Sequence, residues 1–401
     1  MTIGIIKERK TPPDRRVVFT PQQLKQLQQQ YKDLNFIVEP SDIRIFEDKD
    51  YQKQGIEVHE DLSDCDVLLG VKEVPIQALI PGKSYFFFSH TIKKQDYNRK
   101  LLKAILQKKI TLHDHEVITK ANGIRLIGFG RYAGLVGAYN GFRLLGKRHQ
   151  FFDLPKVEYL ADLNAVKAEL DKIDIPNIKI LLTGSGKVAY GAREILEHLD
   201  IREVDVSEYL NTTFDEPVFV NAKVLDYNKR KDGMPGELKA FFKDPKPYKS
   251  DFMRFAKSTD MFIAGHFYGD DAPFLFTRED AKHPDFKIKL VADISCDIDG
   301  PVASTIRPST IANPFYAYDP QTESEVDAMN TEAIGVMAVD NLPCELPKDA
   351  SEGFGEMFAK HVIPAFFNDD EDEILERARM TKDGSLTERY SYLSDFVESE
   401  D

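Results

Sequence analysis

The chain has 401 residues, enough for two or three domains and a large apolar core. Hydrophobic residues make up 42% of it, which excludes wholesale disorder and a small disulfide-stapled scaffold. Its 53 basic and 67 acidic residues give a formal net charge of −14. Because such a field repels phosphate backbones, nucleic acid is not an expected partner.

The cysteines and the apolar runs bear on the expected compartment. Cys65, Cys296 and Cys344 show no Cys-x-x-Cys spacing, which argues against a disulfide framework and favours a reducing compartment. No apolar run reaches the ~18 residues needed to span a bilayer. The first residues, Met1 to Lys7, have the pattern of a strand and not that of a signal peptide. We therefore expect a cytoplasmic protein with no membrane partner, and we leave its oligomeric state open.

Short apolar runs alternate with stretches of helical composition through the first third of the chain. Runs without polar alternation are typical of strands that are buried on both faces of a mostly parallel sheet. Two intervening segments, Pro21–Tyr31 and Gln95–Gln107, have the spacing of amphipathic helices. The predicted strands are Ile3–Ile6, Phe36–Val38, Val67–Val71, Tyr85–Phe88 and Ile110–Leu112.

A second set of apolar runs predicts a second α/β sheet. Before it, the segment from Gly128 to Ala138 is dense in small residues, which permits close helix packing and marks the first crossing between domains. Near the C-terminus, Ser351–Phe367 has helical spacing, and Asp340 or Asn341 can cap a helix start. The predicted strands are Ile178–Leu182, Arg202–Val206, Met261–Ala264 and Leu290–Ile294.

A glycine turn follows the first strand of this second set. Gly184 can make the tight turn, Gly186 lets the backbone approach a pyrophosphate, and Ala189 takes the third small position as the helix begins. A structural glycine turn is the alternative. A Walker-type loop is disfavoured because Val188 stands where Ser or Thr would hold magnesium. The cofactor-binding candidates of the turn are Gly184, Ser185, Gly186, Lys187 and Val188.

Asp205 is the predicted reader of the cofactor ribose. It ends the predicted strand Arg202–Val206 and lies 21 residues after Gly184, close to the ~20 residues that separate the glycine turn from a ribose-binding acid. An acid there bonds ribose hydroxyls and repels a 2′-phosphate, so NAD is favoured. Arg202 nearby keeps NADP possible.

Titratable residues follow three neighbouring strands of the first predicted sheet. Lys72 and Glu73 come after the third strand, His90 after the fourth, and Glu116 shortly after the fifth. Because open parallel sheets bind ligands at the carboxyl ends of their strands, these side chains are expected to converge on one site. A partly desolvated lysine and a histidine are both usable acid–base groups near neutral pH. The alternative is a solvated Lys72 and a structural His90.

Arginines and histidines near these strand ends suggest two further kinds of site. Arg16 and Arg125 are the candidates for binding a substrate carboxylate, since a guanidinium grips a carboxylate in a bidentate fork. His113 and His115 resemble metal ligands, but no third ligand is evident. We therefore predict no metal site.

These residues together resemble the alanine dehydrogenase and transhydrogenase superfamily, in particular its branch of lysine-forming saccharopine dehydrogenases and lysine–2-oxoglutarate reductase domains. The resemblance runs from Gly4 to about Phe396. The motifs that carry it are Asp14-Arg15-Arg16 with Thr20-Pro21, Gly70-Val71-Lys72-Glu73-Val74-Pro75, Phe88-Ser89-His90-Thr91-Ile92-Lys93, Phe129-Gly130-Arg131-Tyr132-Ala133-Gly134, Asp293-Ile294-Ser295, Asn313-Pro314-Phe315, Asp340-Asn341-Leu342-Pro343 and Gly384-Ser385-Leu386 before Tyr390-Ser391-Tyr392.

The resemblance implies an oxidoreductase that transfers hydride between NAD(P) and the imine or secondary amine linking lysine and 2-oxoglutarate. It implies catalytic roles for Lys72 and His90, with the carboxylates of Glu73 and Glu116 tuning the lysine. Substrate carboxylates are assigned to Arg16 and Arg125, and Lys93 and Asp340 lie in the shared motifs as further substrate-binding candidates. Two alternatives stay open: an alanine dehydrogenase-like deaminase and a non-catalytic dinucleotide-binding protein.

The expected architecture is an α/β fold of two Rossmann-like domains with mostly parallel sheets and an interdomain cleft. If the helix at Ser351–Phe367 returns to the first sheet, the first domain is discontinuous. Residues 1–129 and 344–401 are then the substrate and catalytic domain, and residues 130–343 are the dinucleotide-binding domain.

Overall fold

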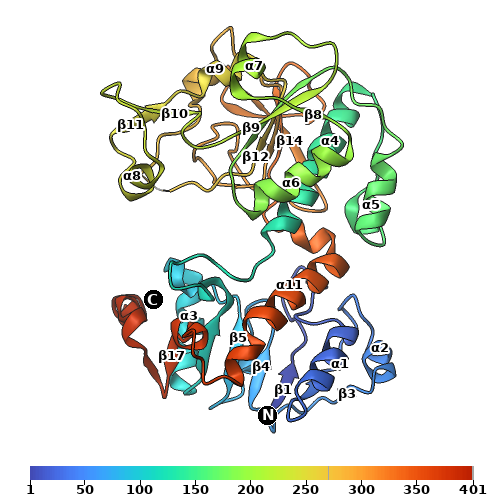
Figure 1. Ribbon diagram of the computed structural model, residues 1–401, viewed down its shortest axis with the longest axis vertical. Coiled ribbons are helices and arrows are strands. Elements are labelled where there is room, and N and C mark those ends of the chain that lie inside the picture. The colour runs from blue at the N-terminus through green and yellow to red at the C-terminus, as the bar shows by residue number, and fades with distance from the viewer. Residues whose placement is uncertain (270, 400–401) are drawn as a thin grey trace. The chain divides into compact units, whose positions relative to one another are not determined.

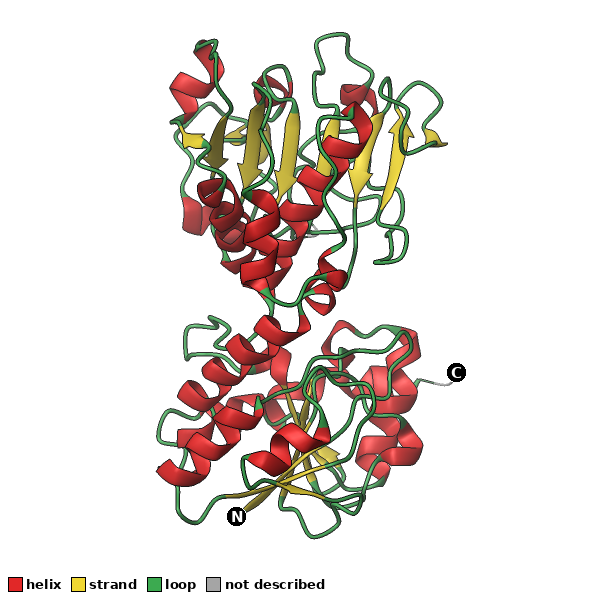
Figure 2. Ribbon diagram, turned by 90° about the vertical axis from the view of Figure 1, so that its right-hand side faces the viewer, coloured by secondary structure: helices red, strands yellow, loops and turns green. Residues whose placement is uncertain are grey.

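A computed structural model describes residues 1–269 and 271–399. The chain divides into two compact units: unit 1 is Met1–Phe129 with Pro347–Asp401, and unit 2 is Gly130–Leu346. Each unit is built on a large, mostly parallel sheet with helices against it, which confirms the predicted fold class (Figures 1 and 2). The second boundary follows residue 346 rather than residue 343.

Unit 1 contains a six-stranded sheet in the order β3-β2-β1-β4-β5-β6, and all of its strands are parallel. The five apolar runs predicted as strands form β1, β2, β4, β5 and β6, and the central strands are buried on both faces. The edge strand β3 was not predicted, and neither of its residues is buried. The strands are β1 (Thr2–Ile5), β2 (Asn35–Val38), β3 (Glu57–Val58), β4 (Val67–Leu69), β5 (Ser84–Phe87) and β6 (Thr111–Asp114).

Helices cover both faces of this sheet. On one face α1 packs beside α11, and Leu24, Phe354 and Phe358 belong to one core. On the other face α3 packs beside α13, and Leu102 and Phe396 belong to a second core. The elements are α1 (Pro21–Gln30), α2 (Asp48–Lys53), η1 (Ile76–Ala78), η2 (Thr91–Lys93), α3 (Asp96–Gln107), η3 (His115–Val117), α11 (Pro347–His361), η6 (Ile363–Phe366), α12 (Ile374–Ala378), β17 (Thr381–Lys382), β18 (Ser385–Leu386), η7 (Glu388–Leu393) and α13 (Ser394–Glu398).

Unit 2 contains an eight-stranded sheet in the order β15-β14-β16-β13-β12-β7-β9-β8. Its pairs are parallel except for β14 with β16 and β15 with β14. A separate antiparallel pair, β10 with β11, follows β9. The strands are β7 (Lys179–Thr183), β8 (Arg202–Glu203), β9 (Val218–Ala222), β10 (Asn228–Arg230), β11 (Tyr248–Ser250), β12 (Met261–Ala264), β13 (Leu290–Asp293), β14 (Phe315–Asp319), β15 (Ser324–Val326) and β16 (Ile334–Met337).

Two long helices of unit 2, α4 and α6, cross at a contact made by glycines. A Cβ on Gly134 of α4 would lie 2.0 Å from the Val188 carbonyl oxygen, and one on Gly191 of α6 would lie 1.9 Å from that of Arg131. The small residues therefore allow the close helix packing that their composition predicted. The helices are α4 (Gly130–His149), η4 (Val157–Tyr159), α5 (Leu163–Leu170), α6 (Lys187–His198), α7 (Val206–Asn211), α8 (Leu238–Lys243), α9 (Met253–Ala256), α10 (Arg278–Ala281) and η5 (Leu342–Glu345).

One of the two strands beside β7 was not predicted from the sequence. The strand predicted at Arg202–Val206 is only Arg202–Glu203, and it lies at the sheet edge as β8. The strand beside β7 is β9, which was not predicted and which pairs with it from Lys179↔Val218 to Thr183↔Ala222.

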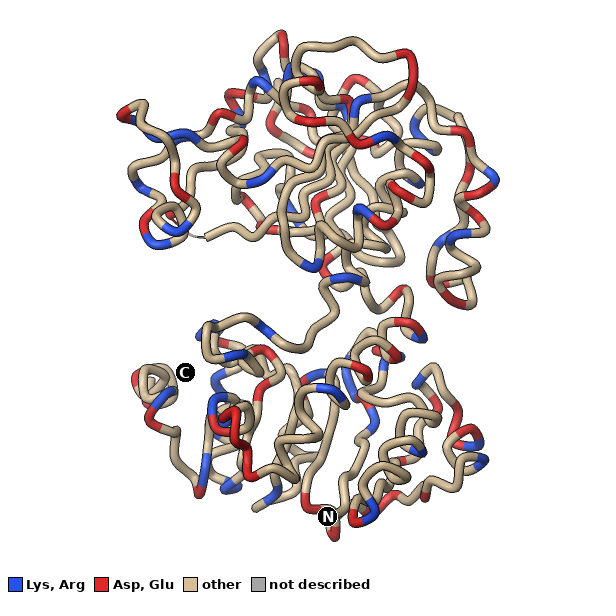
Figure 3. The backbone as a smooth tube through the Cα atoms, viewed as in Figure 1, with Lys and Arg blue, Asp and Glu red and all other residues tan. Residues whose placement is uncertain are grey.

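Basic and acidic residues are interspersed along both units (Figure 3). None of the helices in the described part of the chain is long and apolar enough to cross a membrane.

Candidate active site and dinucleotide loop

The carboxyl ends of β4, β5 and β6 are joined by hydrogen bonds in unit 1. The Phe88 N–H donates to the Val71 carbonyl at 3.0 Å. The Ser89 N–H donates to Asp114 Oδ2 at 3.0 Å, and the Ser89 hydroxyl also bonds this carboxylate. These bonds hold the residues that follow the three strands close together.

His90 lies between two carboxylates at these strand ends. Its Nε2 is 3.7 Å from Glu73 Oε1 and its Nδ1 is 3.6 Å from Glu116 Oε2. Its backbone is left-handed, with φ 55°, and its ring is stacked with Phe88 at 6.1 Å between centroids. The side chain is 24% exposed, so the ring is held by the protein and still reachable from solvent. The structure therefore brings together three of the four predicted catalytic side chains.

Glu116 is surrounded by cationic groups. Its Oε1 is 3.1 Å from Arg125 NH2 and 3.9 Å from Lys93 Nζ. Burial alone would raise the pKa of this carboxyl, but the nearby His90 ring and the charges of Arg125 and Lys93 outweigh it and lower the pKa to about 2. Glu116 is therefore ionised at neutral pH, and two of the predicted substrate-binding cations lie beside it.

Asp114 supports this arrangement from behind. It is fully buried, and it accepts hydrogen bonds from Ser89 and, at 2.7 Å, from the Glu116 N–H. Burial raises its pKa against the effect of these donors. Asp114 thus fixes the backbone directly before His90 and at Glu116.

Lys72 is held through its backbone by Glu8, a residue that the sequence analysis missed. Glu8 Oε1 accepts the Val71 N–H at 2.7 Å and Oε2 accepts the Lys72 N–H at 2.9 Å. Burial raises the pKa of Glu8 to about 7, although the two N–H donors oppose the shift. The only signal in the sequence was its place in a charged run directly after the first strand.

Arg16 and Lys72 both lie near Asp14. Arg16 is buried and donates to Asp14 through Nε at 3.0 Å and NH2 at 2.6 Å, with its guanidinium 4.2 Å from the centroid of Phe129. Burial opposes ionisation of Asp14, but the charges of Arg16 and Lys72 and the Arg16 hydrogen bonds lower its pKa. The guanidinium fork predicted for a substrate thus already holds a carboxylate of the protein.

His113 and His115 have structural partners. The His113 ring is stacked on Phe86 at 4.3 Å, and His115 Nε2 is 2.8 Å from the Gly70 carbonyl oxygen. Burial lowers the pKa of His113 to about 3 and that of His115 to about 4, so both are neutral. Among residues 1–269 and 271–399, no group of three or more His, Cys, Asp and Glu side chains could hold a metal ion.

The glycine turn of unit 2 joins β7 to the 12-residue helix α6. Gly184 has φ 107°, and a Cβ there would lie 2.4 Å from the Gly265 carbonyl oxygen. A Cβ on Gly186 would meet no atom of the chain within 4 Å. Close packing therefore requires glycine at position 184. Gly186 instead leaves open space at the N-terminus of α6. Such a cradle fits a pyrophosphate.

The other residues predicted at the turn lie around this space. Ser185 and Lys187 are exposed and Val188 is half-buried. Lys187 and Val188 begin α6, against which Gly130 of α4 packs. These residues are placed to line the loop, and their contact with a cofactor stays a prediction.

Asp205 does not lie beside the glycine turn. Strand β9 stands between β7 and β8, and Asp205 follows β8 as the N-cap of α7, where its Oδ1 accepts the Glu208 N–H at 2.8 Å. The spacing in the sequence is typical of a ribose-binding acid, but β8, which Asp205 follows, does not pair with β7. Asp340, predicted to bind substrate, is exposed and follows β16 in unit 2, whereas Arg16, Lys93 and Arg125 belong to unit 1.

Comparison with known proteins gives a family context for both units. Residues 4–136 match the model of the alanine dehydrogenase/PNT N-terminal domain. The chain is 30% identical to the mitochondrial alpha-aminoadipic semialdehyde synthase of Mus musculus over 96% of its length, and 28% identical to the Arabidopsis thaliana synthase over 98%. It spans about half of the length of these relatives, 47% and 41% respectively.

A shorter relative is matched over most of its length. The NAD(+), L-lysine-forming saccharopine dehydrogenase of Schizosaccharomyces pombe is 26% identical to this chain, over 86% of the chain and 88% of that enzyme.

The fold is also similar to solved structures. L-alanine dehydrogenase gives a TM-score of 0.67 at 15% identity, covering 99% of this chain and all of that one. A transhydrogenase from Sinorhizobium meliloti gives 0.59 at 16% identity, covering 96% of this chain and all of that one. Residues 4–136 thus match the alanine dehydrogenase/PNT N-terminal domain model, and most of the chain is similar in sequence to aminoadipic semialdehyde synthases and to a saccharopine dehydrogenase.

Proposed function

We propose that this chain is an NAD(P)-dependent oxidoreductase that forms or cleaves saccharopine. In the forming direction the ε-amine of lysine attacks the keto carbon of 2-oxoglutarate, and water leaves to give an imine. Hydride and a proton then convert the imine to the secondary amine of saccharopine. The names of the relatives motivate the substrates, and the observation that carries the proposal is His90 held between Glu73 and Glu116.

This reaction needs proton transfers at an oxygen and at a nitrogen. The carbinolamine oxygen must be protonated to leave as water, and the attacking amine must lose a proton. A histidine and a lysine at neighbouring strand ends supply two acid–base groups, and the division of these steps between Lys72 and His90 stays open. Glu73 and Glu116 lie beside the two ring nitrogens of His90, so they can orient the imidazole.

The charges of the cluster suit a substrate with several carboxylates. Arg125 and Lys93 lie at partly exposed positions beside Glu116, and Lys10 Nζ is 3.3 Å from Glu73 Oε2. Such cations can bind carboxylates of 2-oxoglutarate or saccharopine, while Glu73 and Glu116 can face the amine of lysine. The dinucleotide supplies the hydride, and the loop at Gly184–Gly186 would hold its pyrophosphate.

The test is a nicotinamide absorbance assay with four reactions in parallel: lysine plus 2-oxoglutarate, saccharopine, alanine, and pyruvate plus ammonia. Each is run with both forms of the dinucleotide. The proposal predicts turnover in the first two. Turnover only with alanine and pyruvate would identify a deaminase instead, and dinucleotide binding without any turnover would identify a binding protein.

A further inference from the structure

His90 has a backbone conformation that histidine rarely adopts. Its φ of 55° and ψ of 15° lie in the left-handed region, where the Cβ of an ordinary residue comes too close to the following carbonyl oxygen. Such a conformation persists only where the surrounding structure holds it, and it is found most often at functional sites. The contacts that hold residue 90 therefore bear on how the site works.

The residues on either side of His90 are tied to each other. The hydroxyl oxygens of Ser89 and Thr91 are 2.7 Å apart, and the Thr91 N–H donates to Ser89 Oγ at 3.3 Å. Ser89 also bonds Asp114 through its N–H and its hydroxyl. We call the side chains of Ser89, Thr91 and Asp114 the hydroxyl bridge. All three are fully buried, whereas 24% of the His90 side chain is exposed. Because a buried hydrogen-bonded network is rigid, the bridge can hold the residue that it spans.

The turn that follows His90 is fixed by the same anchor. Thr91 begins η2, and Nζ of Lys93, at the end of η2, lies 3.9 Å from Glu116 Oε1. Asn98 of α3, which is also buried, donates through Nδ2 to the His90 carbonyl at 3.3 Å. A shift of Thr91 would therefore move two groups of the site at once, the imidazole of His90 and the ammonium group of Lys93.

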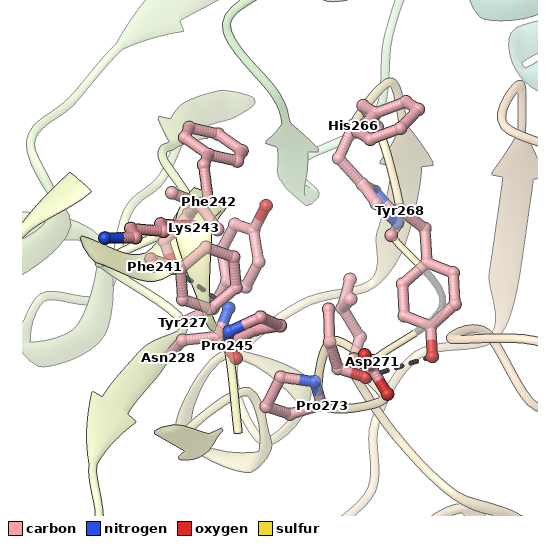
Figure 4. Close-up of a pocket in the computed structure, with 15 residues that line it drawn as sticks. Tyr227, Asn228, Phe241, Phe242, Lys243, Pro245, His266, Tyr268, Asp271 and Pro273 are labelled. Carbon is pink, nitrogen blue, oxygen red and sulfur yellow. Dashed lines mark hydrogen bonds between the residues drawn. The ribbon is translucent and has the colours of Figure 1, made fainter. Parts of the chain in front are cut away.

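Unit 2 contains a histidine that is held in a different way. His266 is buried in the lining of a cavity (Figure 4), and its Nδ1 lies 2.8 Å from the Thr183 hydroxyl. A hydroxyl thus bonds that ring directly. The hydroxyls beside His90 instead bond each other and Asp114, so they hold the backbone while both ring nitrogens face carboxylates. This arrangement fixes the position of the imidazole and leaves its nitrogens available for proton transfer.

We propose that the hydroxyl bridge positions the imidazole of His90 for catalysis by holding this residue in its left-handed conformation. Ser89, Thr91 and Asp114 are thus positioning residues, since they act through His90 and not on the substrate. The consequence for turnover rests on the proposed function. The consequence for the backbone of residue 90 is independent of it.

Steady-state kinetics with lysine and 2-oxoglutarate test the consequence for turnover. Thr91→Val keeps the shape of the side chain and removes its hydroxyl, so it should lower kcat about tenfold by misplacing the imidazole, as should Ser89→Ala. The KM for the dinucleotide should be unchanged. Thr91→Ser restores the hydroxyl and should keep kcat within a factor of about two of the parent value.

Thr381→Val is the matched control. The Thr381 hydroxyl is also fully buried, and in the same unit it donates to the Ile110 carbonyl at 2.7 Å and accepts the Leu112 N–H at 3.0 Å. The variant removes a comparable hydroxyl that is not part of the bridge. It should therefore lower the melting temperature and leave kcat unchanged.

A double variant separates positioning from general damage to the fold. In the His90→Gln background, Thr91→Val should lower the remaining kcat by less than about twofold, because no imidazole is left to position. A tenfold loss in that background would show that Thr91 acts independently of His90.

Glycine and alanine at residue 90 report on the backbone without any assay of activity. Glycine adopts a left-handed conformation freely and alanine does not, so His90→Gly should melt a few degrees above His90→Ala. Adding Thr91→Val to both variants should abolish this difference, and adding Thr381→Val should preserve it.

Three results would overturn the proposal: normal kcat in both Ser89→Ala and Thr91→Val, equal losses from Thr91→Val with and without His90, and a glycine–alanine difference that survives Thr91→Val. If the parent chain does not turn over lysine and 2-oxoglutarate, the proposed substrates are refuted. The melting comparison then still decides whether the bridge holds residue 90.

Discussion

The two units use the carboxyl ends of their strands in different ways. In unit 1 the strand ends carry charged side chains, and buried Glu8 and Asp114 tie neighbouring backbone segments together behind them. In unit 2 glycines follow the end of β7, and the contacts there are made by backbone atoms, by Asn221 and by the Thr183–His266 pair. The site in unit 1 therefore depends on charged side chains, whereas the turn in unit 2 depends on glycines, which have no side chain.

This difference suits unit 1 to proton transfer and the turn of unit 2 to cofactor binding. A proton-transfer site needs several ionisable groups at fixed positions, so it needs buried partners that cost stability. A pyrophosphate site needs N–H groups and open space, which a glycine turn before a helix provides. Substitutions in unit 1 should therefore act on turnover and on its pH dependence, and substitutions at the turn should act on affinity.

The largest expected effect is on turnover in unit 1. Lys72→Met and His90→Gln should each lower kcat by ~10²–10⁴-fold, the usual contribution of one acid–base group. Their losses need not add, because both groups serve one reaction. Steady-state kinetics with lysine and 2-oxoglutarate measure the loss, and dinucleotide affinity should be unchanged.

Matched variants of exposed residues in the same unit give the controls. Lys120→Met and His59→Gln should keep kcat within a factor of two or so, since both side chains lie on the surface. Near-normal turnover in both Lys72→Met and His90→Gln would show that these two side chains are structural and not catalytic. A large loss of dinucleotide affinity in Lys72→Met or His90→Gln would contradict the assignment of dinucleotide binding to unit 2 alone.

An effect of about 2 kcal/mol is expected on the acid stability of unit 1. Burial lowers the pKa of His113 to about 3 in the folded protein. Its neutral form therefore contributes stability that is fully present above pH 6.5 and is lost as the pH falls from 6.5 through 3. At pH 5 the loss is about 2 kcal/mol, at ~1.4 kcal/mol for each pKa unit.

The variant His113→Phe keeps an aromatic ring against Phe86 but removes the imidazole that titrates. Urea unfolding between pH 7.5 and 5 should show a free energy of unfolding that falls less steeply in this variant than in the parent chain. His59→Gln, at the surface, should reproduce the slope of the parent. Identical slopes for His113→Phe and the parent would show that His113 contributes nothing to the acid sensitivity.

The smallest effect, a tenfold or greater loss of dinucleotide affinity, is expected from Gly186→Val. Tenfold corresponds to about 1.4 kcal/mol. The side chain fits the free protein, because no atom lies within 4 Å of the added Cβ. Fluorescence titration with the reduced dinucleotide should thus show weaker binding while the melting temperature is unchanged.

Gly134→Val provides the contrasting case. Its Cβ would overlap the backbone of α6, so this variant should lower the melting temperature first. Unchanged dinucleotide affinity in Gly186→Val would mean that the space above the turn is not used by the cofactor.

The continuous apolar runs predicted the central strands well. The strands predicted at Val67–Val71 and Tyr85–Phe88 are β4 and β5, within two residues at each end, because both of their faces are buried. The side chains directly after such strands follow from the parallel sheet. Lys72, Glu73 and His90 could therefore be grouped from the sequence.

Residues whose position depends on distant contacts could not be predicted. Glu8 reaches the N–H groups of Val71 and Lys72, 63 and 64 residues away, and no local pattern encodes that contact. The pairing of β9 with β7 is also non-local, because the two strands lie more than thirty residues apart in the sequence. The apolar run of β9 nevertheless suits a central strand better than Arg202 and Glu203 of β8 do. Arg16 was a reasonable substrate-binding candidate until the structure placed Asp14 in its fork.

Unit 1 is formed from both ends of the chain, and unit 2 is inserted between them. The Val17 N–H donates to Ser351 Oγ across 334 positions, and Phe354 and Phe358 complete the core around Phe19. During synthesis the first 129 residues leave the ribosome without this half of their core, and they must wait for more than two hundred further residues. Unit 2 is contiguous, so it can fold first and shorten the loop that unit 1 has to close. We therefore expect unit 2 to fold before unit 1, although residues 1–129 precede it in the chain.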